Sequence, residues 1–89
     1  MVEIDIIVVN RSGLHTRPAA ALVKLASRFK SDIQLSRDGF MINAKSIIGV
    51  MTLAAEMGST LRLVVEGSDE EQAADEIKTL FDNGFGEVW

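Results

Sequence analysis

The spacing of hydrophobic residues changes several times along this chain, and each change marks a new element. Residues 2–9 are dominated by Val and Ile, alternating with acidic residues at first and wholly apolar later, which predicts a strand inside a sheet. Residues 10–13 have the composition of a turn. Apolar residues then recur at helical spacing and predict a helix over residues 16–28. Its inward-facing residues are Leu22, Val23 and Ala26.

Two short alternating runs follow the first helix and predict a hairpin. They cover residues 33–36 and 40–42, and Asp38-Gly39 lies between them. Both turn residues tolerate positive φ, so this dipeptide is a strong hairpin signal. Residues 60–66 alternate again and predict a fourth strand.

The segment between the hairpin and the fourth strand predicts a short helix over residues 47–52, with Ser46 as its cap. Its apolar residues cover more than half of the circumference, which is wider than a surface helix normally buries. One arc contains Val50, Leu53 and Ala54, and the neighbouring arc contains Ile47, Ile48 and Met51. We expect one arc to pack on the core and the other to stay partly exposed as a partner site. The alternative is that a loop covers the second arc.

A last helix is predicted after the fourth strand. Ser68 and Glu71 have the separation of a capping box, which places Ser68 at the N-cap. Gly84 is expected to end the helix. The apolar stripe of this helix consists of Ala73, Ala74, Ile77, Leu80 and Phe81. The tail, residues 85–89, has no clear pattern, and Trp89 either packs on the domain or frays.

The predicted order β-α-β-β-α-β-α indicates a single α+β domain over residues 1–89, with helices segregated from a largely antiparallel sheet. The chain has no Cys and one His, which argues against disulfides and a metal centre. It has no recognisable signal peptide and no apolar run near the roughly 20 residues that span a bilayer. We therefore expect a soluble cytoplasmic protein that binds no membrane.

Charge is divided unevenly along the chain. The net charge of −4 argues against nucleic-acid binding. Residues 1–45 hold seven Lys/Arg and four Asp/Glu, a balance of +3, whereas residues 46–89 hold two and nine, a balance of −7. The basic half suits acidic partner surfaces or phosphate groups, although chance clustering on a solvated face explains it equally well. Its cations include Arg11, Arg17, Lys24, Arg28 and Lys45.

The only His and the only Pro of the chain lie where the first strand leads into the first helix. His15 falls at or just before the first helical residue, where backbone N–H groups lack intrahelical partners and favour an anion. Arg17 adds a cation whose planar fork suits phosphate oxygens, and Pro18 costs little in a first turn. A neutral imidazole beside an anion site fits reversible phosphorylation of the ring. The alternative is an incidental polar residue at a surface turn.

Two segments resemble motifs of HPr, the histidine-containing phosphocarrier of the bacterial sugar phosphotransferase system. The segment Gly13-Leu14-His15-Thr16-Arg17-Pro18-Ala19 resembles the active-site signature of that family. The segment Asn43-Ala44-Lys45-Ser46-Ile47-Ile48-Gly49-Val50-Met51 resembles its regulatory serine segment. Their separation is the usual one, and the similarity covers nearly the whole chain. The resemblance implies an open-faced β-sandwich, in which three helices, the middle one short, lie on one face of a four-stranded sheet.

The resemblance also implies a phosphocarrier function. His15 would accept a phosphoryl group on Nδ1 from phosphorylated enzyme I and pass it to sugar-specific enzyme IIA components. Arg17 and the N–H groups of Thr16 and Arg17 would position the phosphate and stabilise its charge. Such a protein is a phosphoryl-transfer intermediate rather than a stand-alone catalyst, and no bound cofactor is expected.

A regulatory adaptor is the alternative that the resemblance leaves open. Ser46 would then be the main input, through a serine kinase and phosphorylase, and the output would be docking to a transcriptional regulator or an enzyme. The docking residues implied by the family are Ile47, Ile48, Met51, Lys24 and Lys45. Adaptor-type relatives lack the active-site histidine, so His15 favours the carrier, and a nitrogen-branch carrier would share its chemistry. Ser46 as a plain N-cap stays open, as does a small-molecule-binding module, whereas the lack of an aromatic platform argues against RNA.

Overall fold

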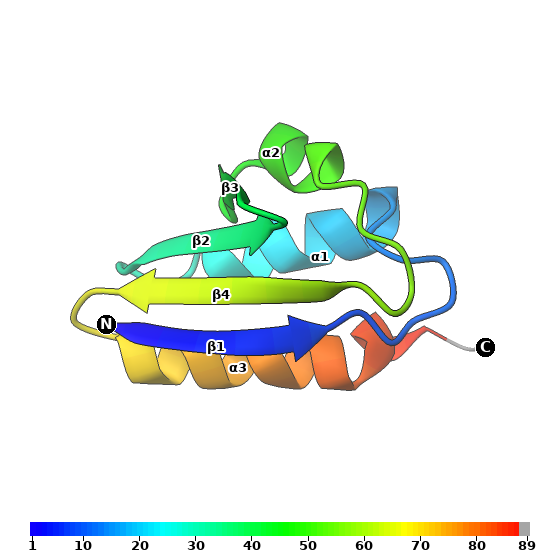
Figure 1. The fold of residues 1–89 in the computed structure, drawn as a ribbon. Coiled ribbons are helices and arrows are strands. Elements are labelled where there is room, and N and C mark those ends of the chain that lie inside the picture. The colour runs from blue at the N-terminus through cyan, green and yellow to red at the C-terminus, as the bar shows by residue number, and fades with distance from the viewer. Residues whose placement is uncertain (88–89) are drawn as a thin grey trace.

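The computed structural model describes residues 1–87 and shows a four-stranded sheet with helices packed on one face (Figure 1). The elements are β1 (Val2–Ile7), α1 (Thr16–Ala26), β2 (Asp32–Arg37), β3 (Phe40–Asn43), α2 (Ile47–Thr52), β4 (Thr60–Glu66), α3 (Glu70–Asp82) and a 3-10 turn (Gly84–Gly86). The predicted α+β class and element order are confirmed. The prediction for Trp89 lies outside the described residues.

The strands form one antiparallel sheet in the order β1-β4-β2-β3. Among residues 1–87, β1 pairs only with β4, through pairs such as Ile4 with Leu63, so it is an edge strand. The prediction of an interior strand is therefore wrong. The continuous apolar run suggested a strand with neighbours on both sides, but its residues alternate between two environments. Ile6 is buried, and Ile7 is 51% exposed on the open face of the sheet. Val and Ile favour the extended backbone even on a half-exposed surface.

The core lies between the sheet and helices α1 and α3, which run across the same face (Figure 1). Its largest fully buried side chains include Leu22, Ile33, Leu35, Leu61, Leu63, Ile77 and Phe81. The predicted stripe of α3 is confirmed, with Leu80 half-buried at its margin. α1 ends at Ala26 rather than Arg28, because the next two backbone hydrogen bonds, from Arg28 to Leu25 and from Phe29 to Ala26, join residues three apart instead of four. These turns bring Phe29 into the core.

The predicted hairpin turn at Asp38-Gly39 and the predicted Ser46 cap are both present. Asp38 and Gly39 have φ values of 52° and 85°, as a tight hairpin turn between β2 and β3 requires. The Ser46 hydroxyl accepts the Gly49 N–H at 3.1 Å and caps α2. Within α2, Val50 is buried whereas Ile48 is 74% exposed. The second arc is thus open and is not covered by a loop.

The start of α3 differs from the predicted capping box. Asp69, not Ser68, is the N-cap, and the Glu70 carboxylate accepts the Gly67 N–H at 3.1 Å. The Asp69 carboxylate accepts the N–H groups of Lys30 and Ser31 at 2.9 and 3.0 Å and the Ser31 hydroxyl. Lys30 and Ser31 follow α1, and Ser31 is buried, so the hydrogen-bond donors of these two residues need an acceptor within the protein. Asp69 supplies this acceptor, and the N-cap of α3 therefore lies one residue after the predicted position.

We expect Asp69→Asn to weaken the acid dependence of stability. The Ser31 hydroxyl and the backbone N–H groups of Lys30 and Ser31 lower the pKa of Asp69 from 3.8 to about 2. Because the folded pKa lies below the unfolded one, these bonds stabilise the fold above about pH 4, and that stabilisation is lost as pH falls toward about 2. Thermal unfolding followed by circular dichroism between about pH 2 and 7 tests this. Asp75→Asn, on the exposed side of α3, is the matched control, and equal pH slopes for both variants would contradict the prediction.

Candidate active site

His15 occupies the N-cap of α1, as the sequence pattern predicts. Its backbone is extended, with φ −80° and ψ −171°, and its carbonyl accepts the Ala19 N–H at 2.9 Å. The side chain makes no capping hydrogen bond and is 44% exposed. The N–H groups of Thr16 and Arg17 belong to the first turn, where the helix supplies no acceptor. The imidazole therefore stands in solvent next to the positive end of a helix dipole.

The loop before His15 is held in place by the segment that follows α2. Leu14 is buried, and its N–H donates to the Ala55 carbonyl at 2.9 Å. Gly13 has φ 69°, a value that favours glycine, and a Cβ added there would lie 2.5 Å from the Ala55 carbonyl oxygen. The close approach of these two loops explains the glycine two residues before His15.

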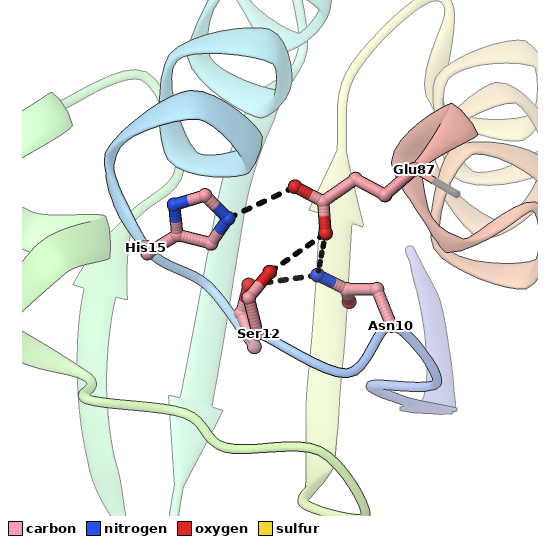
Figure 2. A network of polar contacts seen from close by, with 5 residues as sticks. Asn10, Ser12, His15 and Glu87 are labelled. Atoms are coloured by element: carbon pink, nitrogen blue, oxygen red, sulfur yellow. Dashed lines mark hydrogen bonds and ion pairs between the residues drawn. The ribbon is translucent and has the colours of Figure 1, made fainter. Parts of the chain in front are cut away.

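A carboxylate from the end of the described chain meets the imidazole (Figure 2). Glu87 Oε2 lies 2.9 Å from His15 Nε2. Glu87 Oε1 accepts Asn10 Nδ2 at 2.9 Å and Ser12 Oγ at 2.8 Å. Asn10 is fully buried, and its Nδ2 also donates to the Gly13 carbonyl at 2.8 Å. Three donors from the loop before α1 thus converge on one side chain.

The backbone after α3 directs Glu87 toward this loop. Gly84 has φ 60°, which turns the chain at the end of α3 as the sequence predicts. Phe85 also has a positive φ, 58°, and its ring packs edge-on against Phe81 with centroids 4.8 Å apart. The sequence pattern missed Glu87, because a short tail has no periodicity. The one available signal was an aromatic residue near a carboxylate after a helix-ending glycine.

These contacts fix the charge of Glu87 and the direction of its bond to His15. Hydrogen bonds from Asn10, Ser12 and His15 lower the pKa of Glu87 from 4.5 to about 2. At neutral pH the side chain is therefore a carboxylate, which only accepts hydrogen bonds. It follows that Nε2 of His15 carries the hydrogen. The second ring nitrogen, Nδ1, points away from Glu87 (Figure 2).

The His15 side chain lines a shallow depression, and two guanidinium groups line the same depression. Its lining residues are Arg11, Ser12, His15, Arg17, Phe85, Gly86 and Glu87. Within residues 1–87, the ion pairs of the protein leave both Arg11 and Arg17 without a carboxylate partner. Two free cations beside a helix N-terminus make this depression suitable for a phosphate group.

The other predicted site residues gather around α2. Ile47 and Met51 are each 40% exposed and lie beside the more exposed Ile48. We call these three residues the α2 patch. The half-buried Ser46 caps the same helix.

The two predicted docking lysines differ in their surroundings. Lys24 is exposed on α1, which packs against α2. Lys45 Nζ donates to the Phe29 carbonyl at 2.8 Å, so this ammonium is tied to the chain after α1.

Residues 1–87 contain neither a side-chain cluster suited to a metal ion nor a helix suited to crossing a bilayer. In this part of the chain, no cluster of three or more His, Cys, Asp or Glu side chains is arranged to hold a metal ion. Over the same residues, no helix has the length and apolar character needed to cross a membrane.

Comparisons with known proteins agree with this geometry. The family model described as "PTS HPr component phosphorylation site" matches residues 2–83. The chain is 55% identical to the phosphocarrier protein HPr of Treponema pallidum, over 98% of this chain and 99% of that protein. It is 48% identical to the HPr-like protein Crh of Halalkalibacterium halodurans, over 84% and 89%. The crystal structure of HPr-C-His from Thermoanaerobacter tengcongensis superposes with a TM-score of 0.96, at 43% identity and over 100% of both chains. The chain therefore belongs to the HPr family, the phosphocarrier proteins of the phosphotransferase system.

Proposed function

We propose that His15 is the residue that carries the phosphoryl group, which it receives from phosphorylated enzyme I and passes to enzyme IIA components. The observation that supports this most is the N-cap position of His15, with Nε2 bonded to Glu87 and Nδ1 directed away from it. The guanidinium of Arg17, which has no carboxylate partner within residues 1–87, lies in the same depression and would complete an anion site around the ring.

The chemistry follows from these positions. Nδ1 attacks phosphorus in line with the bond to the donor, and the donor atom leaves with its electron pair. The charge on the three equatorial oxygens is stabilised by Arg17 and by the N–H groups of Thr16 and Arg17. The reverse geometry delivers the group to an acceptor imidazole or other nucleophile. Phosphoryl transfer depends mainly on positioning and charge stabilisation, so an exposed surface site is sufficient.

The direct test is incubation with phosphoenolpyruvate and enzyme I, followed by intact-mass and peptide mass spectrometry. We expect one phosphoryl group per chain, located on His15, labile in acid and stable in alkali as a P–N bond is. Transfer of this group to an enzyme IIA component then tests the second half of the proposal. Acid-stable label, or label on another residue, would refute the assignment of His15.

We further propose that phosphorylation of Ser46 regulates docking at the α2 patch. Ser46 caps α2 through Gly49, and the patch residues Ile47, Ile48 and Met51 follow in the same helix. A phosphate adds about −1.5 to −2 charges at neutral pH. Because the charge would lie beside the patch, an acidic partner docked there would be repelled. The adaptor function would use the same input and the same surface.

Ser46→Asp is expected to slow enzyme I-dependent phosphorylation of His15 while keeping the thermal midpoint near that of the wild type. Asp caps a helix about as well as Ser, so the fold is preserved. The effect should be larger at low than at high ionic strength, because exposed charges are screened by salt. Initial rates measured over a salt series test this. Ser68→Asp adds the same charge at an exposed turn away from α2 and is the control. Unchanged kinetics at all salt concentrations would show that enzyme I does not dock at the α2 patch.

A further inference from the structure

We propose that Glu87 is a positioning residue for phosphoryl transfer: its carboxylate holds the neutral His15 ring with the hydrogen on Nε2, so that the lone pair is presented at Nδ1. This inference rests on the proposed role of His15 and adds a residue to it. Glu87 contacts the ring at Nε2 and not at Nδ1, so it acts only through the ring (Figure 2).

The carboxylate itself is firmly located. Its two oxygens have different hydrogen-bond partners: Oε2 accepts from His15, and Oε1 accepts from Asn10 and Ser12. Asn10 is fully buried and is fixed by a further bond to the Gly13 carbonyl. The side chain of Glu87 is only 19% exposed. A carboxylate restrained by donors of this kind has one orientation, and it imposes one orientation on the imidazole.

The tail that carries Glu87 is also anchored. Phe85 packs on Phe81 of α3, and Gly84, the first residue of the turn, is buried. The contact between Glu87 and His15 therefore joins the end of the described chain to the start of α1. This contact therefore helps to hold the residues that follow α3 in place.

The choice of tautomer has a chemical consequence. A neutral imidazole has one N–H and one lone pair, and a carboxylate can only accept. The bond to Glu87 therefore selects the ring with hydrogen on Nε2 and the lone pair on Nδ1. When Nδ1 attacks, the Nδ1–P bond forms, the bond between phosphorus and the phosphorylated donor protein breaks, and its electron pair leaves with the donor. No proton has to leave the ring.

Glu87 also opposes the charge that transfer creates. Once Nδ1 carries the phosphoryl group and Nε2 keeps its hydrogen, the ring is cationic and faces the carboxylate. A carboxylate plays the same double part in serine hydrolases, where it orients the histidine and stabilises its imidazolium form. Repulsion of the incoming phosphate is limited, because three donors already engage the carboxylate and it bonds the nitrogen opposite to Nδ1.

The experiment compares Glu87→Gln and Glu87→Ala with the wild type in two measurements. 15N NMR of the imidazole, recorded where the ring is neutral, reports the tautomer. The single-turnover rate of phosphorylation by enzyme I reports transfer. We expect the wild-type ring to hold hydrogen on Nε2 and both variants to give a mixture of tautomers. Their rates should fall by about 10-fold, the lower end of the usual cost of removing a partner that orients a metal-bound histidine. Glu66→Gln removes the same charge at the far end of β4 and is the matched control.

The outcomes separate the two proposals. A changed tautomer with an unchanged rate would show that Glu87 orients the ring without contributing to transfer, which overturns the positioning role and leaves His15 as the carrier. An unchanged tautomer in both variants would overturn the inference at its first step. Wild-type label on a residue other than His15 would overturn both proposals. Glu87→Gln preserves the size of the side chain, so a rate loss confined to Glu87→Ala, with wild-type tautomer and rate in Glu87→Gln, would indicate lost packing and also overturn the role of the carboxylate.

Discussion

Replacing His15 by alanine is expected to abolish phosphorylation by enzyme I and to leave the fold intact. His15 is the only imidazole of the chain, so no second ring can accept the group. Its side chain is 44% exposed and makes no capping bond to α1, so the loss of stability should be small. Intact-mass spectrometry after incubation with phosphoenolpyruvate and enzyme I measures the first effect, and thermal unfolding measures the second.

The matched control for this variant is Gln34→Ala, which shortens an exposed polar side chain in β2, on the open face of the sheet. It should accept the phosphoryl group as the wild type does. Residual label in His15→Ala at wild-type stoichiometry would end the assignment. A collapse of the thermal midpoint would mean instead that the loop before α1 depends on the ring for its structure.

Arg17→Ala is expected to slow phosphoryl transfer to His15 by about 10²-fold or more, which is the usual cost of removing one preorganised charge contact from a transition state. The guanidinium is exposed in the depression, and within residues 1–87 no carboxylate binds it, so its partner is expected to be the phosphate. For the same reason the free energy of unfolding should change little. Rapid-quench single-turnover kinetics at saturating phosphorylated enzyme I would measure the rate without a contribution from docking.

Two further variants make the Arg17 result specific. Arg17→Lys keeps the charge and loses the planar fork, so it should recover only part of the rate. Arg62→Ala removes an arginine that pairs with Glu3 and Asp5 on the open face of the sheet, and surface pairs of this kind contribute little to stability. Arg62→Ala should transfer at the wild-type rate. Equal rates for Arg17→Ala and wild type would place the anion site elsewhere.

Local patterns were sufficient to predict most of the fold. The Asp38-Gly39 turn, the Ser46 cap and the stripe of α3 depend on neighbours within a few residues, and all three are present in the structure. The same holds for the N-cap position of His15, because the change from strand to helix is itself a local signal.

The features that sequence reasoning missed depend on distant contacts. β1 lies at the edge because β4 takes the position between β1 and β2, and no spacing within β1 reports its neighbours. The N-cap of α3 is Asp69 and not the predicted Ser68, because the N–H donors of Lys30 and Ser31 require an acceptor. Glu87 reaches His15 from a tail whose Phe85 packs against α3. Each of these is decided by tertiary packing.

The contact between Gly13 and the Ala55 carbonyl limits which sequences can carry this site. Any larger residue at position 13 would have to displace a backbone atom at position 55, since the clash involves main chain and not a flexible side chain. The displaced carbonyl is the acceptor for Leu14, the residue next to His15. Tolerance to change in the loop that presents the imidazole is thus set by a loop on the other side of α2. A designer who grafts residues 10–17 onto another scaffold would need to supply the Ala55 carbonyl with them.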